Sequence, residues 1–237
     1  MKTIGLLGGT GWSSTIRYYT QINEEINRRL GGFHSGEILL RSIDYHEIMS
    51  QYGKDHSQIA NILSNRLTEL SKLKPDCIII CCNSLHKYYD IIKEGLSLKI
   101  PVTHALELTA EAAKVSSYGS VLLLATFFTM NDGFFQKTLE NNGVNVVLPN
   151  EEEREKIHQV HLELMANNIT DEGKEFFSRL IELYSDKADA VILGCTEFAL
   201  AVDQNSSVLP IIDPVDLQVA SAIDFSLGST ELPRDEL

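Results

Sequence analysis

Several features that identify common protein classes are missing from this 237-residue chain. No apolar run approaches the roughly 18 residues of a membrane-spanning helix, and the N-terminal stretch is glycine-rich strand and turn sequence rather than a signal peptide. Basic residues are scarce: 20 Lys and Arg stand against 33 Asp and Glu, a formal net charge of -13. That charge would repel the phosphates of nucleic acids and anionic lipids. We therefore expect a cytoplasmic protein whose partner is a small molecule, with no nucleic acid and no membrane.

Signatures of the common cofactors and metals are also absent. Residues 8–11 have neither the GxGxxG spacing of a dinucleotide site nor the lysine of a Walker loop. The chain has no Schiff-base lysine motif, no flavin fingerprint and no CxxC pair, so we expect no cofactor and no metal. Zinc ligation by Cys81, Cys82, His86 and Cys195 is a weaker alternative, because adjacent cysteines chelate poorly. The four cysteines are expected to be free thiols in a reducing compartment.

An internal repeat is the most informative pattern that is present. Residues 76–86 and residues 189–197 each contain an apolar run of buried-strand length that ends in a cysteine followed by small polar residues. Each run is preceded by another strand-like segment that leads into a helix and is followed by a proline-containing strand, at residues 4–12, 121–129, 99–104 and 208–213. The same order of elements therefore occurs twice.

The repeat predicts an α/β fold made of two similar Rossmann-like lobes with mostly parallel sheets, related by a pseudo-twofold axis. We assign residues 1–100 and 213–237 to the first lobe, which carries Cys82, and residues 101–212 to the second, which carries Cys195. Open α/β folds bind ligands at the carboxyl edge of the sheet. We therefore expect the active site in the cleft between the lobes.

Helical periodicity predicts the first long helix after the glycine-rich turn. Ser13 and Ser14 are suitable caps for this helix, and its apolar positions recur at helical spacing in Ile16, Tyr19, Ile22 and Ile26. The last helix is predicted over residues 214–226.

Cys82 and Cys195 are the candidate catalytic residues. Alignment of the repeats pairs Cys82 with Cys195 and Cys81 with Gly194, a position where a small side chain suffices. Two thiols on opposite sides of a tetrahedral carbon suit removal of a proton from one face and delivery of a proton to the other. His86, one helical turn beyond Cys82, either orients that thiol or has a purely structural role.

Polar residues beside the cysteines are the candidate substrate ligands. Asn83, Ser84 and Thr196 follow the cysteines directly and can donate hydrogen bonds to a carboxylate on which negative charge develops. Thr10, in the glycine-rich turn, is expected to face the ligand. Gln51 lies in a polar loop of the kind that often forms a pocket wall.

These motifs resemble those of a known family. Three segments are similar to its Gly-Gly-Met, Cys-Asn-Thr-x-His and Gly-Cys-Thr-Glu signatures: Gly8-Gly9-Thr10, Cys82-Asn83-Ser84-Leu85-His86 and Gly194-Cys195-Thr196-Glu197. The family is that of the cofactor-independent aspartate/glutamate racemases. The similarity covers nearly the whole chain, and residues 4–32, 42–48 and 154–157 look most like the bacterial aspartate racemases and broad-specificity amino-acid racemases.

The resemblance implies a racemase in which Cys82 and Cys195 exchange protons with an amino-acid substrate, without a cofactor. It implies that the substrate is held by Asn83, Ser84, Thr126, Lys156, Thr196 and Glu197. By composition alone Lys156 is a solvated surface lysine, but it matches the position at which the family binds the side-chain carboxylate. The resemblance also implies a homodimer.

Substrate choice stays open at this stage. Ser84 stands where the family usually has threonine, Thr10 replaces a frequent methionine, and the Ile-Pro-Asp-Arg loop of many aspartate-specific members is absent. Aspartate, glutamate and a broader set of amino acids are therefore all possible substrates. Rival functions are a maleate isomerase, a decarboxylase that needs a single cysteine, and a non-catalytic amino-acid binding protein.

Overall fold

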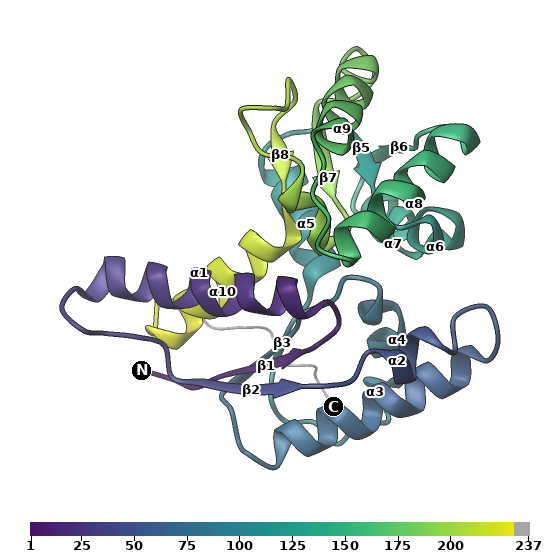
Figure 1. Ribbon diagram of the computed structural model, residues 1–237. Helices are drawn as coiled ribbons and strands as arrows, with labels where there is room; N and C mark the ends of the chain where they lie inside the picture. The colour runs from purple at the N-terminus through teal and green to yellow at the C-terminus, as the bar shows by residue number, and fades with distance from the viewer. Residues whose placement is uncertain (230–237) are drawn as a thin grey trace. The chain divides into compact units, whose positions relative to one another are not determined.

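The computed structural model describes residues 1–229, and the chain divides into two compact units (Figure 1). Unit 1 comprises Met1–Ala105 and Gln218–Leu237, and unit 2 comprises Leu106–Leu217. The end of the predicted segment 213–237, from residue 230 on, lies outside the described residues. The predicted α/β fold with two similar, parallel-sheet lobes is confirmed.

Unit 1 is built on a four-stranded parallel sheet with the strand order β2-β1-β3-β4. Its elements in chain order are β1 (Ile4–Gly8), α1 (Trp12–Leu30), β2 (Ile38–Ser42), α2 (His46–Met49), α3 (His56–Ser71), β3 (Cys77–Ile80), α4 (Leu85–Ile92) and β4 (Val102–Thr103). The C-terminal part of α10 (Pro214–Ser226) also belongs to this unit. Figure 1 shows α1 and α10 on one face of the sheet and α3 on the other.

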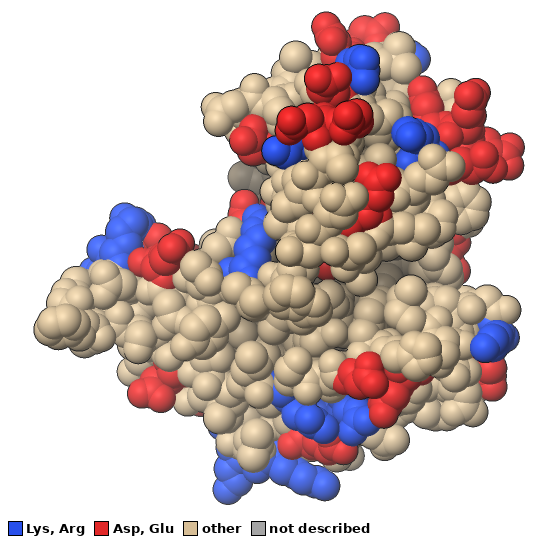
Figure 2. Space-filling model, viewed as in Figure 1, with Lys and Arg blue, Asp and Glu red and all other residues tan. Residues whose placement is uncertain are grey.

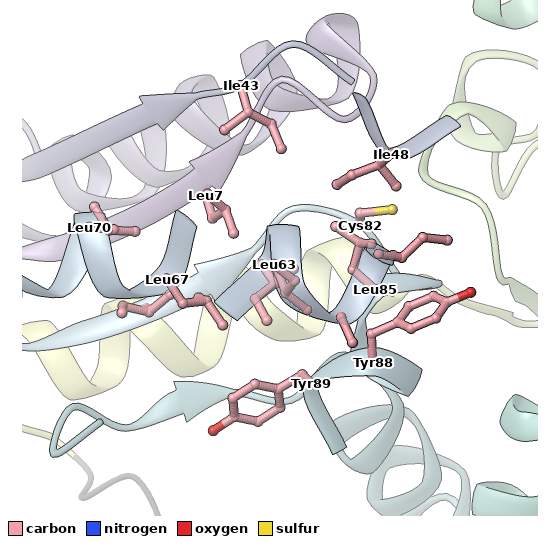
Figure 3. Packing of buried hydrophobic residues seen from close by; sticks show 14 of the residues in the cluster. Leu7, Ile43, Ile48, Leu63, Leu67, Leu70, Cys82, Leu85, Tyr88 and Tyr89 are labelled. Carbon is pink, nitrogen blue, oxygen red and sulfur yellow. The ribbon is translucent and has the colours of Figure 1, made fainter. Parts of the chain in front are cut away.

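The core between this sheet and α3 extends to Cys82. Leu7 and Ile80 from the sheet and Leu63 from α3 are fully buried in one apolar cluster. Figure 3 shows Cys82 in the same cluster, near Ile48 of α2. β1 and β3 are buried on both faces, as their continuous apolar sequences predict. Cys82 follows β3 and packs at the edge of the same core.

The first helix differs from its prediction. It begins at Trp12, with Gly11 in the left-handed conformation as N-cap (φ 105°), so Ser13 and Ser14 lie inside the helix. Ile16 and Tyr19 are 54% and 50% exposed. The inward face instead consists of Ser14, Thr15, Tyr18, Ile22 and Ile26.

Contacts of the glycine-rich turn explain this rotation of the helix. The backbone N–H of Gly9 donates to Thr15 Oγ1 at 2.9 Å, and a Cβ on Gly8 would lie 2.4 Å from Thr15 Cγ2. The absence of a side chain at Gly8 thus lets the turn pack directly on Thr15. This contact directs the helix face that contains Thr15 toward the sheet.

Unit 2 repeats the same architecture, with the strand order β6-β5-β7-β8 and all pairings parallel. Its elements are α5 (Ala105–Val115), β5 (Ser120–Leu124), α6 (Phe127–Asp132), α7 (Phe134–Asn141), β6 (Asn145–Val147), α8 (Glu151–Met165), α9 (Asp171–Leu183), β7 (Ala190–Leu193), the 3-10 helix η1 (Thr196–Leu200), β8 (Ile211–Ile212) and the start of α10. Cys82 and Cys195 therefore each lie two residues beyond the third strand of their unit.

Backbone hydrogen bonds show that the two units match residue by residue. Cys81 N donates to Leu7 O at 3.0 Å, and Gly194 N donates to Leu124 O at 2.6 Å. On the other side of the same strands, the matching bonds are Ile78 N to Pro101 O and Val191 N to Pro210 O, both 2.9 Å. Cys82 and Cys195 each follow the residue that makes the first of these bonds, so they occupy equivalent positions.

The charge of the chain is visible on the surface of unit 2. The first turns of α8 and α9 contain Glu151, Glu152, Glu153, Asp171 and Glu172, and Figure 2 shows acidic side chains spread over this unit. Acidic groups at these positions stabilise the N-termini of the helices. Among residues 1–229, none of the helices combines the length and the apolar character that a membrane crossing requires.

Candidate functional site

The Cys82 thiol in unit 1 is surrounded by hydroxyl groups. Its Sγ lies 3.3 Å from Ser84 Oγ and 3.9 Å from Tyr45 Oη. The hydroxyl of Tyr52 in turn lies 3.0 Å from Ser84 Oγ. Burial raises the pKa of Tyr45 and of Tyr52, and the neighbouring Cys82 raises both further. Both phenols therefore keep their protons at neutral pH and can donate hydrogen bonds toward the sulfur and the serine.

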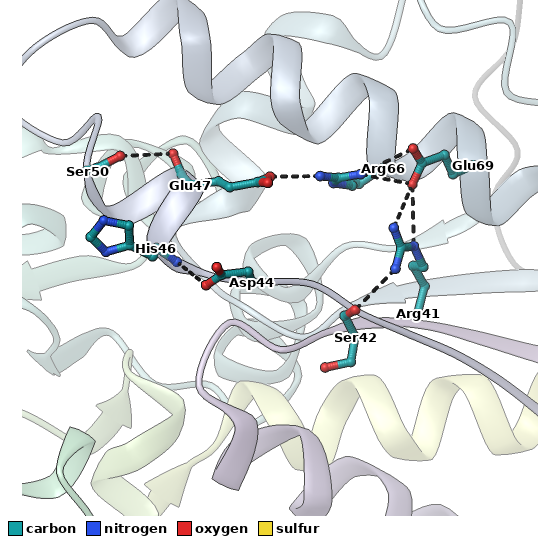
Figure 4. A network of polar contacts seen from close by, with 8 residues as sticks. All are labelled: Arg41, Ser42, Asp44, His46, Glu47, Ser50, Arg66 and Glu69. Carbon is teal, nitrogen blue, oxygen red and sulfur yellow. Dashed lines mark hydrogen bonds and ion pairs between the residues drawn. The ribbon is translucent and has the colours of Figure 1, made fainter.

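An ion-pair network holds the segment that carries the two tyrosines (Figure 4). Arg66 of α3 contacts Glu47 of α2 at 2.7 Å and Glu69 at 3.2 Å, and Glu69 also contacts Arg41 of β2 at 3.0 Å. Ile48 anchors α2 from the inside, because its side chain is fully buried in the apolar cluster. The residues that flank α2 are thereby held beside Cys82.

Two further predicted residues of unit 1 are buried at the same strand end. The Thr10 hydroxyl donates to the carbonyl of Cys81 at 3.0 Å, so in this structure it supports the backbone of the turn. Asn83 is only 3% exposed. Gln51 lies further out, half-buried, and its side-chain amide donates to Ser50 Oγ at 3.2 Å.

His86 belongs to a buried polar network on α4. Its Nε2 accepts from Ala105 N at 3.5 Å and lies 3.4 Å from Nε2 of Gln218. Gln218 also donates to Thr103 O at 2.7 Å and accepts from the Tyr18 hydroxyl. Burial, above all, lowers the pKa of His86 well below its usual value, so the ring is neutral. These contacts support the structural one of the two predicted roles.

The Cys195 thiol in unit 2 has different surroundings. Its Sγ donates to Glu197 Oε2 at 3.2 Å, and the hydroxyl of Thr196 donates to the same oxygen at 2.9 Å. Glu197 Oε2 thus accepts a hydrogen bond from each of these two neighbours. His161 of α8 completes the group: one ring nitrogen lies within 4.8 Å of both the Cys195 sulfur and a Glu197 oxygen. Burial lowers the pKa of His161, which favours its neutral form.

Gly194 allows the chain to place Cys195 at this point. A Cβ at Gly194 would lie 2.9 Å from Ala125 Cβ and 3.1 Å from the carbonyl oxygen of Leu124. Both contacts are closer than ordinary packing permits, so β7 approaches β5 as closely as it does only because residue 194 has no side chain. The sequence analysis expects that a small side chain suffices at position 194, but these contacts favour glycine, which has none.

Two further predicted residues belong to helices of unit 2. Lys156 is exposed on α8, and its Nζ lies 3.5 Å from Gln159 Oε1. Thr126 is the N-cap of α6, where its hydroxyl accepts from Thr129 N at 3.2 Å. Lys156 is thus on the same helix as His161, whose ring nitrogen lies within 4.8 Å of the Cys195 sulfur.

Sequence reasoning missed three residues beside the thiols: Tyr45, Tyr52 and His161. Tyr45 and Tyr52 belong to the same polar loop as Gln51, so the sequence predicts the loop but not the side chains that lie near Cys82. His161 belongs to a helix whose face cannot be related to a distant strand end by periodicity alone. The only signal for it was its position five residues after Lys156, on a helix already selected by resemblance.

The fold and the two thiol sites define a class of protein. It is a duplicated α/β protein in which each half places a cysteine, with hydroxyl, carboxylate or imidazole groups near its thiol, at the carboxyl end of its sheet. That edge is where open α/β folds bind ligands.

Comparison with known proteins identifies the family. The sequence model of the Asp/Glu/hydantoin racemase family matches residues 7–222. The chain therefore belongs to the Asp/Glu/hydantoin racemase family, whose named racemases are isomerases.

Individual relatives agree with this assignment. The chain is 26% identical over 219 residues to the broad-specificity amino-acid racemase RacX of Bacillus subtilis (strain 168), covering 89% of this chain and 92% of that protein. A crystal structure from Yersinia pestis, of a protein assigned as an Asp/Glu racemase, has 33% identity and a TM-score of 0.85, covering 96% of this chain and all of that one. An aspartate racemase homologue from Pyrococcus horikoshii OT3 has 31% identity and a TM-score of 0.81, over 96% and 100% of the two chains.

Proposed function

We propose that this protein is an amino-acid racemase that interconverts the L- and D-forms of aspartate, glutamate or both, with Cys82 and Cys195 as its two acid/base groups. One observation carries the proposal: the two cysteines occupy equivalent positions in two duplicated units, each one residue beyond the same backbone hydrogen bond. Membership of a racemase family supports the reaction class.

The proposed reaction is a balanced exchange of two protons. One cysteine, as thiolate, removes the α-proton from one face of the substrate and becomes a thiol. The other cysteine, a thiol at the start, delivers its own proton to the opposite face and becomes a thiolate. The roles swap in the reverse direction, and the reaction needs no cofactor. The mechanism requires both sulfur atoms to reach one α-carbon from opposite sides.

The predicted polar residues supply the binding groups in this proposal. Asn83, Ser84 and Thr196 hold the α-carboxylate and the α-amine, and Lys156 binds the side-chain carboxylate. Thr10, Gln51, Thr126 and Glu197 complete the surroundings, with Thr10 acting through the Cys81 carbonyl to which it donates. The active particle is proposed to be a homodimer, as the family resemblance implies, and to act in the cytoplasm, as the sequence analysis expects.

Proton exchange with solvent tests the proposal. L-Aspartate and L-glutamate are incubated with the purified protein in deuterated water, without pyridoxal phosphate. The expected product is the D-enantiomer with deuterium at the α-carbon, measured by chiral chromatography and mass spectrometry. A substrate that stays protonated and enantiomerically pure, across both amino acids, would contradict racemase activity.

Variants of the two cysteines test the mechanism. Cys82→Ser and Cys195→Ser should each reduce net racemisation by at least about 100-fold, because a hydroxyl replaces the thiol acid/base group. Cys77→Ser is the matched control, since Cys77 lies inside β3 at its amino end. Full activity in either of the first two variants would remove that cysteine from the mechanism.

A further inference from the structure

Three side chains of unit 2 bring together a sulfur, a nitrogen and an oxygen. One potential ligand atom from each of His161, Cys195 and Glu197 lies within 4.8 Å of the other two. Cys195 Sγ and Glu197 Oε2 are only 3.2 Å apart. Among the described residues, the buried Nδ1 of His161 has no hydrogen-bond partner.

Aromatic packing holds the imidazole at this place. The His161 ring lies 6.0 Å from the ring of Phe198, nearly perpendicular to it (81°). Phe198 belongs to η1, is fully buried, and packs on Phe177 of α9 with a centroid distance of 4.9 Å. Because η1 also carries Glu197, the same short segment positions the carboxylate and the ring against which the histidine rests.

The three atoms form a donor set that zinc prefers. Thiolate sulfur, imidazole nitrogen and carboxylate oxygen are the usual protein ligands of Zn²⁺, with bonds of about 2.0–2.3 Å. The ligand atoms of one tetrahedral ion are consequently about 3.3–3.8 Å apart. The sulfur and the oxygen already have nearly this separation, and the histidine nitrogen lies within 4.8 Å of both, so ligation requires the ring to move toward them. Hard cations such as Mg²⁺ do not favour sulfur.

We propose that His161, Cys195 and Glu197 form a three-ligand binding site for Zn²⁺, and that its occupation inhibits the enzyme. On binding, the Cys195 thiol releases its proton to solvent and the sulfur lone pair bonds to the metal, without oxidation or reduction. Water occupies the fourth position. The inhibitory effect rests on the proposed role of Cys195, because a metal-bound sulfur cannot exchange a proton with substrate. The binding itself does not depend on that role.

Cobalt titration of the full-length protein, reduced with a phosphine, tests the site independently of activity. Co²⁺ bound by a thiolate in a tetrahedral site gives a near-ultraviolet charge-transfer band and intense visible bands. We expect one equivalent of Co²⁺ per chain to produce these bands and Zn²⁺ to remove them by displacement. Cys195→Ser should abolish the charge-transfer band, whereas Cys82→Ser should retain it.

A pair of histidine variants on the same helix separates ligation from structural damage. His161→Asn should weaken Co²⁺ binding by at least about tenfold, since the loss of a ligand costs no less than the loss of an outer partner. His158→Asn is the matched control, because His158 is exposed and lies less than one helical turn from His161. The affinity of this variant for Co²⁺ should stay unchanged. Circular dichroism confirms that each variant is folded.

Each outcome decides the proposal. No charge-transfer band at saturating Co²⁺, a band that requires Cys82, or equal affinity in the two histidine variants would overturn it. A second measurement follows racemisation with added Zn²⁺, where we expect inhibition that a chelator reverses. A protein that binds Co²⁺ through Cys195 but racemises nothing would refute the proposed function and leave the metal site intact. An active racemase that gives no charge-transfer band would refute the metal site and leave the proposed function intact.

Discussion

Cys82 and Cys195 occupy equivalent backbone positions, but their thiols have different neighbouring groups. Hydroxyls of Tyr45 and Ser84 lie around the Cys82 sulfur and can donate to it. The Cys195 thiol instead donates to the carboxylate of Glu197. Donors stabilise a thiolate, whereas a neighbouring negative charge disfavours it. If both cysteines are acid/base groups, as proposed, these neighbours suit Cys82 to be the base and Cys195 to be the acid in the free protein.

Alkylation rates should reveal this difference between the thiols. Iodoacetamide reacts with the thiolate, and the two residues are similarly buried, at 8% and 6% exposure. At neutral pH we expect Cys82 to be alkylated faster than Cys195, as measured by mass spectrometry of the separate peptides. Glu197→Gln should accelerate Cys195 by about tenfold, the ratio that corresponds to 1.4 kcal/mol of removed repulsion, with the Cys82 rate as internal control. Faster alkylation of Cys195 in the unaltered protein would contradict the assignment.

Lys156 is the residue whose interpretation depends most on resemblance. Its exposed position on α8 agrees equally with a solvated lysine and with a ligand that reaches a substrate carboxylate. If it binds that carboxylate, Lys156→Ala should raise the KM for aspartate or glutamate by about ten- to hundredfold, the range for a lost charged hydrogen bond. The KM for alanine or serine, where either is turned over, should change little.

A second exposed lysine of unit 2 provides the control for this experiment. Lys174 on α9 forms an ion pair with Asp171, and Lys174→Ala should leave all KM values unchanged. Steady-state kinetics over a panel of amino acids is the measurement. If the KM rises equally for charged and neutral substrates in Lys156→Ala, Lys156 does not bind the side-chain carboxylate and is a solvated surface residue.

At the scale of elements, patterns local to the chain were predictable and packing between elements was not. The two apolar runs before Cys82 and Cys195 predicted β3 and β7, because a strand buried on both faces has a continuous apolar sequence. The inward face of α1 was only partly predicted, since the contact between Gly8 and Thr15 sets its rotation. The tyrosines at Cys82 were missed for the same reason: the Arg66 ion pairs that hold α2 join residues distant in sequence.

The close contact at the ends of the adjacent parallel strands β5 and β7 gives a prediction about Gly194. An added methyl group would meet Ala125 Cβ and the Leu124 carbonyl, and neither can move without displacing β5. We expect Gly194→Ala to lower the free energy of unfolding by about 1–3 kcal/mol, as overpacked cores do. Urea denaturation measures this. Because Cys195 is the next residue, racemisation should fall as well, even where the variant is fully folded.

Gly119 provides a matched control in the same unit. A Cβ at Gly119 would have Asp189 Oδ2 as its nearest contact, at 3.7 Å, which is ordinary packing distance. Gly119→Ala should therefore change the free energy of unfolding by no more than about 0.5 kcal/mol. Equal effects of the two substitutions would show that close approach at Gly194 is not what limits this position.

At the scale of the whole molecule, duplication is the property from which the proposed chemistry follows. Both units have the same strand order and the same backbone hydrogen bonds before the cysteine. A single unit offers only one of the two proposed acid/base thiols, which is sufficient for a reaction that adds or removes a proton on one face only. Racemisation by two bases needs the second, so neither unit alone should racemise an amino acid.

Mixed particles test whether the two thiols act within one chain. The proposal pairs Cys82 and Cys195 of the same chain in a homodimer, whose mass by light scattering would be about 53 kDa, twice the 26.5 kDa of the chain. Co-expression of Cys82→Ser and Cys195→Ser chains with different affinity tags yields mixed dimers after two purification steps. We expect these to be as inactive as each variant alone, because every chain still lacks one thiol. Recovery of a substantial fraction of normal activity would instead mean that the site takes one cysteine from each chain, and the intrachain pairing would then be wrong while the two-base chemistry would stand.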